Sequence, residues 1–74
     1  MDDAEIQRVL ARNIRAFARK KKVTLTRLAD FAGVGKSQLF RVLSGETSPS
    51  LRWIVKVADA LDVEPWQLLA SRPR

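Results

Sequence analysis

The chain has 74 residues, 46% of them hydrophobic, and a formal charge of +6, which predicts one small, basic domain with a limited core. It contains neither Cys nor His, so disulfides and thiolate or imidazole metal sites are excluded, and we expect no metal, cofactor or small-molecule ligand. No apolar run is long enough to span a membrane, and the acidic N-terminus lacks the apolar core of a signal peptide, so we expect a cytoplasmic protein.

The spacing of apolar residues predicts helices throughout, and no segment alternates in the manner of a strand. The first helix is expected over about Asp3 to Lys21, with its inward stripe at Ile6, Leu10, Ile14 and Phe17. Arginines recur on another side of this helix, at Arg8, Arg12, Arg15 and Arg19, and the lysines Lys20 to Lys22 follow. This basic side is either an ordinary solvated face or a surface along a phosphate backbone, and the sequence leaves both interpretations open.

Two short helices joined by a tight turn are predicted next. Thr24 is expected to cap the second helix, because its hydroxyl can accept a hydrogen bond from an early N–H. Gly33 ends that helix in the left-handed conformation, only Val34 and Gly35 precede the third helix, and Gly45 ends the third. The inward residues are Leu28, Ala29 and Ala32 in the second helix and Leu39, Val42 and Leu43 in the third.

A fourth helix is expected from Leu51 to about Leu61, capped by Ser50 and followed by a turn at Asp62. Pro65 suits the first position of a short fifth helix, and the tail over about 71–74 is expected to fray. The inward residues of the fourth helix are Leu51, Ile54, Val57, Ala58 and Leu61, and Trp53, off this stripe, is expected to be partly buried.

The stretch GVGKS, Gly33 to Ser37, ends like the phosphate-binding loop of nucleotide-binding proteins, but three observations argue against that interpretation. The loop requires a glycine five residues before the Gly-Lys pair, and Asp30 occupies that position. The loop also follows a strand, whereas LTRLADFA has helical spacing, and a chain of this length cannot supply the doubly wound sheet behind it.

A helix-turn-helix accounts for the same residues. Two helices that cross steeply need a small residue at their contact, which Ala29 supplies, and the turn needs a residue that tolerates positive φ, which Gly33 supplies. Val34 is expected to close the turn against the core. The pattern runs from Leu25 to Ser44, and in such a motif the second helix enters the major groove of DNA.

The chain resembles the Cro and lambda-repressor-like helix-turn-helix proteins, also called the XRE family, over nearly its whole length. The segments that carry the resemblance are VTLTRLADFAGVGKSQLFRVLSG, PSLRWIVKVADALDV and EPWQLL. The resemblance implies an all-α, compact five-helix bundle, a single domain over 1–74 with its helix-turn-helix at about 25–44. It further implies a bacterial or phage protein that binds a palindromic or pseudo-palindromic double-stranded DNA operator, frequently as a homodimer, and resides at the nucleoid when bound.

The resemblance and the basic stretch together assign expected roles to individual residues. The chain departs from the family where Leu25 replaces a phosphate-binding Gln, where Glu46 places a carboxylate near phosphates, and where Ala18 and Leu43 replace an ion pair with an expected apolar contact. The expected base-reading residues are Lys36, Ser37, Gln38, Phe40 and Arg41. The expected backbone-binding residues are Arg19, Lys22, Thr24, Gly35, Ser44, Thr47 and Ser48. The expected dimer interface comprises Val63, Trp66 and Leu69.

Several of these residues also have a purely structural interpretation. Lys36 and Arg41 are either DNA ligands or ordinary surface charges, Phe40 either contacts a thymine methyl or packs against the core, and Trp66 either caps the core or joins a dimer interface.

At the level of function, we expect a sequence-specific transcriptional regulator, a repressor or controller protein. The alternative is a DNA-binding antitoxin, or another protein-interaction module of a toxin–antitoxin pair. An enzyme is not expected, because without His and Cys it would need a carboxylate pair, and Asp59 and Asp62 lie at an exposed helix end.

Overall fold

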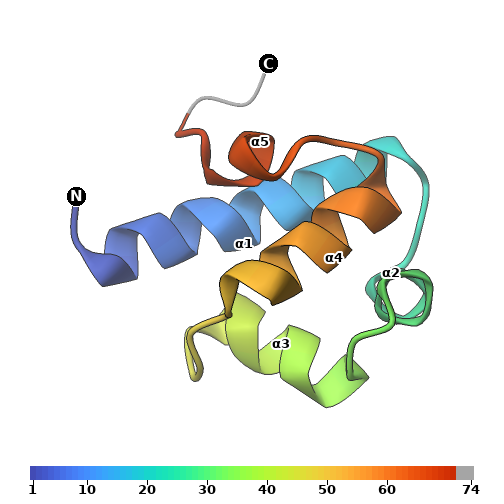
Figure 1. The fold of residues 1–74 in the computed structure, drawn as a ribbon, viewed down its shortest axis with the longest axis horizontal. Coiled ribbons are helices and arrows are strands. Elements are labelled where there is room, and N and C mark those ends of the chain that lie inside the picture. The colour runs from blue at the N-terminus through green and yellow to red at the C-terminus, as the bar shows by residue number, and fades with distance from the viewer. Residues whose placement is uncertain (72–74) are drawn as a thin grey trace.

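The computed structural model describes residues 1–71, which form five α-helices without a strand (Figure 1). The helices are α1 (Asp3–Lys20), α2 (Leu25–Ala32), α3 (Lys36–Ser44), α4 (Leu51–Leu61) and α5 (Pro65–Leu69). The predicted five-helix, all-α fold is therefore confirmed, with α1 ending one residue before its expected end. Most of the tail predicted to fray lies outside the described residues, but Ser71 is described, and its carbonyl accepts a hydrogen bond of 2.8 Å from Arg12.

Three of the helices begin with a polar side chain that accepts a backbone hydrogen bond. Thr24 Oγ1 accepts from the N–H of Arg27 at 3.2 Å, and Ser50 Oγ accepts from the N–H of Trp53 at 3.1 Å, so both predicted caps are confirmed. Asp2 caps α1 in the same way, over 2.8 Å to the N–H of Glu5. The first helical turn of α1, α2 and α4 is thereby stabilised by about 1 kcal/mol each.

The four longer helices end in the same turn, which a residue of positive φ makes possible. After α2 and α3 that residue is glycine, Gly33 with φ of 69° and Gly45 with φ of 85°, as the sequence predicts. After α1 and α4 it is Lys22 and Asp62, each with φ of 58°. A side chain is disfavoured in this conformation, so these two positions cost stability that a glycine would avoid.

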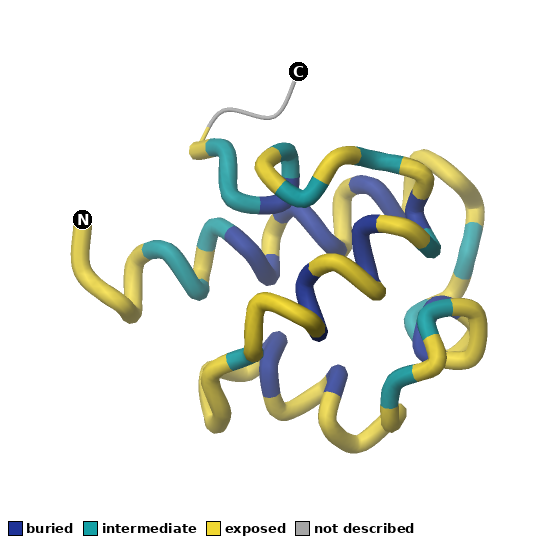
Figure 2. Tube along the Cα trace, viewed as in Figure 1, coloured by how far each residue is buried: buried dark blue, intermediate teal, exposed yellow. Residues whose placement is uncertain are grey.

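The core lies where the five helices meet, and α1 packs against α2, α3 and α5 (Figures 1 and 2). Side chains from every helix are completely or almost completely buried there. Ala18 and Leu43 are both members of this core, as their apolar character predicts, while Ile6 and Ala32 of the predicted inward set are only partly buried. The largest of the fully buried apolar side chains are Leu10, Ile14, Leu28, Leu39, Val42, Val57, Leu61 and Leu68.

The predicted orientation of the first turn of α4 is wrong. Leu51 was expected to face inward but is 79% exposed, whereas Trp53, expected to be partly buried, is only 4% exposed. The buried side of α4 is centred on Val57 and Leu61, so Leu51 lies at its edge and in the terminal turn. Trp53 is itself a member of the core.

A buried amide joins α1 to α5. Asn13 is fully buried on α1, and its Nδ2 donates hydrogen bonds to the carbonyl oxygens of Gln67 at 3.3 Å, Leu68 at 2.9 Å and Ala70 at 2.8 Å. These carbonyls belong to the end of α5, where a helix leaves acceptors unsatisfied. Asn13 therefore acts as a side-chain cap for a five-residue helix that would not be stable alone.

Candidate nucleic-acid interface

The contact between α2 and α3 has the geometry that the sequence predicts. Ala29 is buried where α2 meets its neighbours, and Val34 packs against the core from the turn. The N–H groups of Gly33 and Val34 donate to the carbonyls of Asp30 and Ala29 at 3.2 Å and 3.1 Å, which fixes the turn. The helix-turn-helix thus holds α3 at one edge of the molecule, opposite α5 in the view of Figure 1.

One side of α3 is buried and the other is open. Leu39, Val42 and Leu43 face the core, while the opposite side is exposed, as the yellow segments of Figure 2 show. Phe40 is 43% exposed, so its alternative placement in the core is wrong. Within residues 1–71, the exposed side chains at the start and middle of α3 make no hydrogen bond or ion pair to the rest of the protein. They are Lys36, Ser37, Gln38 and Arg41.

The loop after α3 is tied to α1 by a residue that the sequence did not single out. Gln7 Nε2 donates hydrogen bonds to the carbonyl oxygen of Val42 at 3.0 Å and to that of Thr47 at 2.6 Å. The bonds connect residues far apart in sequence and fix the loop that carries the predicted backbone ligands Thr47 and Ser48. The available signal was a polar residue, Gln7, directly after an apolar position of the inward stripe.

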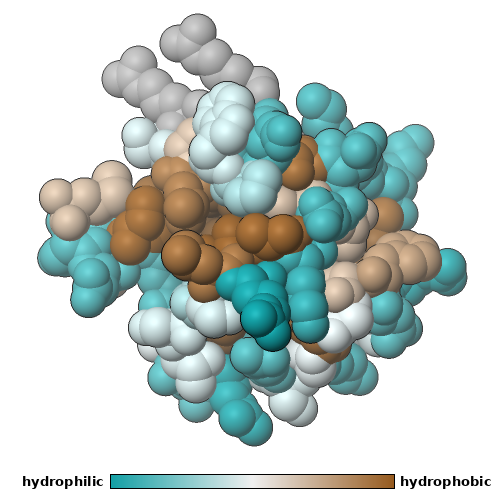
Figure 3. Space-filling model, in the orientation of Figure 1, coloured by the Kyte–Doolittle hydropathy of each residue, from teal (hydrophilic) through white to brown (hydrophobic). Residues whose placement is uncertain are grey.

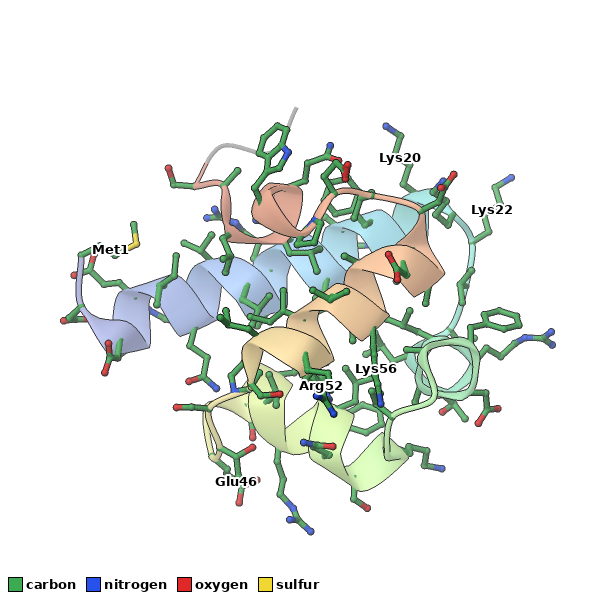
Figure 4. The ribbon with its side chains drawn as sticks, in the orientation of Figure 1. Met1, Lys20, Lys22, Glu46, Arg52 and Lys56 are labelled. Carbon is green, nitrogen blue, oxygen red and sulfur yellow. The ribbon has the colours of Figure 1, made fainter. Side chains whose placement is uncertain are left out.

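Glu46 alters the expected phosphate site in the same loop. The hydroxyl of Ser44 donates to the carbonyl of Arg41 at 3.1 Å and to Glu46 Oε2 at 3.2 Å, so this predicted phosphate ligand is already engaged. Figure 4 shows Glu46 at the same edge of the molecule as α3. A phosphate approaching Ser44 would meet the carboxylate of Glu46 and be repelled.

The basic end of α1 is not brought together with α3. Figure 4 shows Lys20 and Lys22 at the far side of the molecule from α3, both directed away from it. Arg19 is exposed in the last turn of the same helix end. The structure instead directs two other cations, Arg52 and Lys56 of α4, toward the start of α3 (Figure 4). The sequence did not predict a role for Arg52 or Lys56, because nothing in their spacing distinguishes them from a solvated helix face.

The residues expected at a dimer interface differ in exposure. Trp66 is 68% exposed, so it does not cap the core, whereas Val63 and Leu69 are partly buried against it. Leu51 and Val55 of α4 also expose large apolar side chains. Figure 3 shows hydrophobic surface across the viewed side of the molecule, and a hollow there is lined by Ile6, Leu10, Ile54 and Leu69.

Other kinds of site receive no support from the described part of the chain. Among residues 1–71 there is no group of three or more Asp or Glu side chains that could hold a metal ion. No helix in that range is long and apolar enough to cross a membrane. What residues 1–71 do provide is a helix-turn-helix with one open, cation-bearing helix, which is the geometry of a DNA-binding protein.

Comparison with known proteins identifies the family within that class. Residues 14–65 match the family described as Helix-turn-helix, so the chain belongs to the helix-turn-helix proteins of Cro/C1 or XRE type. A crystal structure of a hypothetical transcription factor, NHTF from Neisseria, is similar, with a TM-score of 0.85, 31% identity, 95% of this chain and 80% of that chain covered. No curated protein sequence matches the chain. The family match and the similarity to a transcription factor support DNA-binding transcriptional regulation.

Proposed function

We propose that this protein is a sequence-specific regulator that inserts α3 into the major groove of double-stranded DNA. The observation that carries the proposal is the open side of α3, where the side chains of Lys36, Ser37 and Arg41 make no polar contact with the rest of residues 1–71. Side chains on the open side of a helix that is packed on the core, and that have no partner within the protein, are available to bind base edges. The expected location of such a protein is the cytoplasm, at the nucleoid when it is bound to DNA.

The base contacts follow from residue chemistry. Arg41 can donate two hydrogen bonds to guanine, and Lys36 is the second residue suited to guanine. Phe40, exposed beside them, can contact a thymine methyl, and Ser37 lies on the same open side of α3. The proposed backbone contacts come from the start of α2 and of α3, at Thr24 and Gly35, and from the loop that Gln7 fixes, at Thr47 and Ser48.

The proposed form on DNA is a homodimer on a palindromic or pseudo-palindromic operator. A two-fold dimer would present its two α3 helices about 34–36 Å apart, one turn of DNA. The exposure of Trp66 supports an interface that includes Val63, Trp66 and Leu69. Exposed apolar patches mark interaction sites in many proteins, and a dimer interface would cover Trp66.

The sign of regulation is proposed as repression, or control of a small gene set, since a bound α3 would obstruct other proteins at the same DNA. An antitoxin would use the same DNA-binding side and a second protein on its apolar surface. Copurification from the native host separates the two, because a stoichiometric, unrelated protein partner is expected only for the antitoxin.

The test is to titrate double-stranded DNA from upstream of the protein's own gene with the protein. Fluorescence anisotropy measures the affinity at several salt concentrations. The expected result is that log affinity falls linearly with log salt, by roughly 0.9 per phosphate contacted. A scrambled duplex of equal length is the control and is expected to bind more weakly. Affinity that does not change with salt, or that is equal for both duplexes, would contradict the proposal.

A further inference from the structure

We propose that the hollow between the start of α3 and the exposed side of α4 binds one phosphate of the DNA backbone, with Arg52 and Lys56 as its cationic ligands. The proposal rests on the proposed function and adds ligands to it from α4, a helix outside the helix-turn-helix. The hollow has a volume of about 220 Å³, and its wall includes Gly35, Gln38, Arg52, Trp53 and Lys56.

The first support is the free start of α3. A side chain caps α1, α2 and α4, but Gly35 stands at the N-cap of α3 and supplies none. Within residues 1–71, the backbone N–H groups of Lys36, Ser37 and Gln38 have no hydrogen-bond acceptor. Such groups carry the positive end of the helix dipole and favour an anion.

The second, independent support is a buried donor without a partner in the same wall. Trp53 is 4% exposed, and its indole Nε1 makes no hydrogen bond within the described chain. An indole N–H can only donate, and leaving it buried and unpaired is unfavourable. A phosphate oxygen bound in the hollow beside Arg52 and Lys56 would supply the missing acceptor.

The third support is the sign of the charges around the hollow. Arg52 and Lys56 lie four residues apart, on one side of α4, and Figure 4 shows both directed toward α3. No Asp or Glu contributes to the wall, and neither cation pairs with a carboxylate in residues 1–71. A guanidinium and an ammonium around one hollow suit a phosphate, which accepts several charge-assisted hydrogen bonds.

The position of the hollow favours a DNA phosphate over a free anion. Gln38 belongs both to the wall of the hollow and to α3, the helix proposed to read bases. A phosphate bound there would therefore border the groove that α3 occupies. This placement moves Gln38 from the predicted base-reading set to the backbone set.

The test compares Arg52→Ala and Lys56→Ala with Lys20→Ala, which removes the same charge at a position directed away from α3. Both α4 variants are expected to lose affinity roughly tenfold on every duplex alike. Because both cations bind the same phosphate, the Arg52→Ala, Lys56→Ala double variant should reduce the salt slope by about 0.9, while Lys20→Ala changes neither affinity nor slope. If the α4 variants behave like Lys20→Ala while the unaltered protein binds DNA, this inference is wrong and the proposed function stands.

A gain-of-stability variant tests the free helix start separately. A Cβ at Gly35 would meet only Gln38, at 3.7 Å from its Cβ and 4.0 Å from its backbone nitrogen, so Gly35→Ser fits. Its hydroxyl would cap α3, and we expect a higher melting temperature together with weaker DNA binding. Stronger or unchanged binding would count against a phosphate at these N–H groups.

NMR identifies what occupies the hollow. The indole N–H signal of Trp53 and the amide signal of Gln38 are expected to shift when duplex DNA is added, and not to shift in an Arg52→Ala, Lys56→Ala double variant. The second arm of the experiment adds millimolar inorganic phosphate in place of DNA. If phosphate shifts these signals to saturation while DNA causes no shift, the hollow binds a free anion instead. If the unaltered protein binds no DNA at all, both this inference and the proposed function fail.

Discussion

Asn13 on α1 and Arg41 on α3 are both polar residues on helices that contribute to one core, but their surroundings differ. The amide of Asn13 is buried and donates to three carbonyls of α5 and the residue after it, whereas the guanidinium of Arg41 is exposed and meets no acceptor among residues 1–71. The first region uses its polar groups to hold the fold, and the second leaves them for a partner. Substitutions should therefore reduce stability between α1 and α5 and reduce binding on α3.

The largest effect on stability is expected for Asn13→Leu. The substitution keeps the branching at Cγ, adds volume at a fully buried position and leaves the carbonyls of Gln67, Leu68 and Ala70 without their donor, which should cost about 2–4 kcal/mol of unfolding free energy. Urea unfolding followed by circular dichroism measures this loss. Arg12→Ala is the control, since it removes an exposed hydrogen bond to Ser71 and should change stability by less than about 0.5 kcal/mol. Equal midpoints for both variants would refute the role of Asn13.

Trp66→Ala tests whether the α5 side of the molecule forms a dimer interface in addition to its part in the fold. Trp66 is largely exposed, so its removal should barely affect stability, but it should weaken self-association by about 2 kcal/mol if it anchors a dimer. Sedimentation equilibrium measures the dissociation constant. Leu51→Ser is the matched variant on the other exposed apolar surface and is expected to leave association unchanged. The reverse result would place the interface on α4, and monomers at high concentration and on DNA would exclude the dimer.

Gln7 lies between the two regions, so its replacement should affect both. Gln7→Met removes two hydrogen bonds to carbonyls of α3 and of the loop after it, and should cost about 1 kcal/mol of stability. Because Thr47 and Ser48 would then be less well fixed, DNA affinity should fall by a similar factor on all sequences. Anisotropy against the operator and a scrambled duplex measures this fall, and a selective loss on the operator alone would contradict a positioning role.

The smallest effect on stability is expected at the end of α4. Of Asn13→Leu, Gln7→Met and Asp62→Gly, only the last is expected to raise the free energy of unfolding. Asp62 has φ of 58°, where glycine is less strained, so Asp62→Gly should stabilise the protein by about 0.5–1 kcal/mol without changing DNA affinity. The exposed contact of 3.9 Å between Lys21 and Asp62 is lost as well, and Lys21→Ala shows how little it contributes. A lower melting temperature for Asp62→Gly would show that the aspartate has a role beyond the turn.

The sequence predicted those features that neighbouring residues determine. The caps Thr24 and Ser50 and the terminal glycines Gly33 and Gly45 act within a few residues of their own position, so local spacing was sufficient to find them. Most of the buried positions of the helices also followed from their period, with Leu51 and Trp53 of α4 as exceptions.

The features that the sequence did not predict depend on distant parts of the chain. The three acceptors of Asn13 are more than fifty residues away, and Gln7 reaches a loop about forty residues away. The position of Arg52 and Lys56 beside the start of α3 depends on how α4 packs against α2 and α5, which no local pattern encodes. The sequence correctly predicted which side of α3 is exposed, because the apolar residues that face the core recur at the helical period.

The central claim is that α3 reads bases, and the most direct test is the binding of Arg41→Ala to the operator and to operators with single base-pair changes. An operator is first selected from random double-stranded DNA with the unaltered protein. If Arg41 binds a guanine, the variant should lose about 1–3 kcal/mol on the operator, and at one base pair it should no longer distinguish the correct base from the others. An equal loss of affinity on every sequence would mean that Arg41 contacts only the backbone, and base reading by this residue would be wrong.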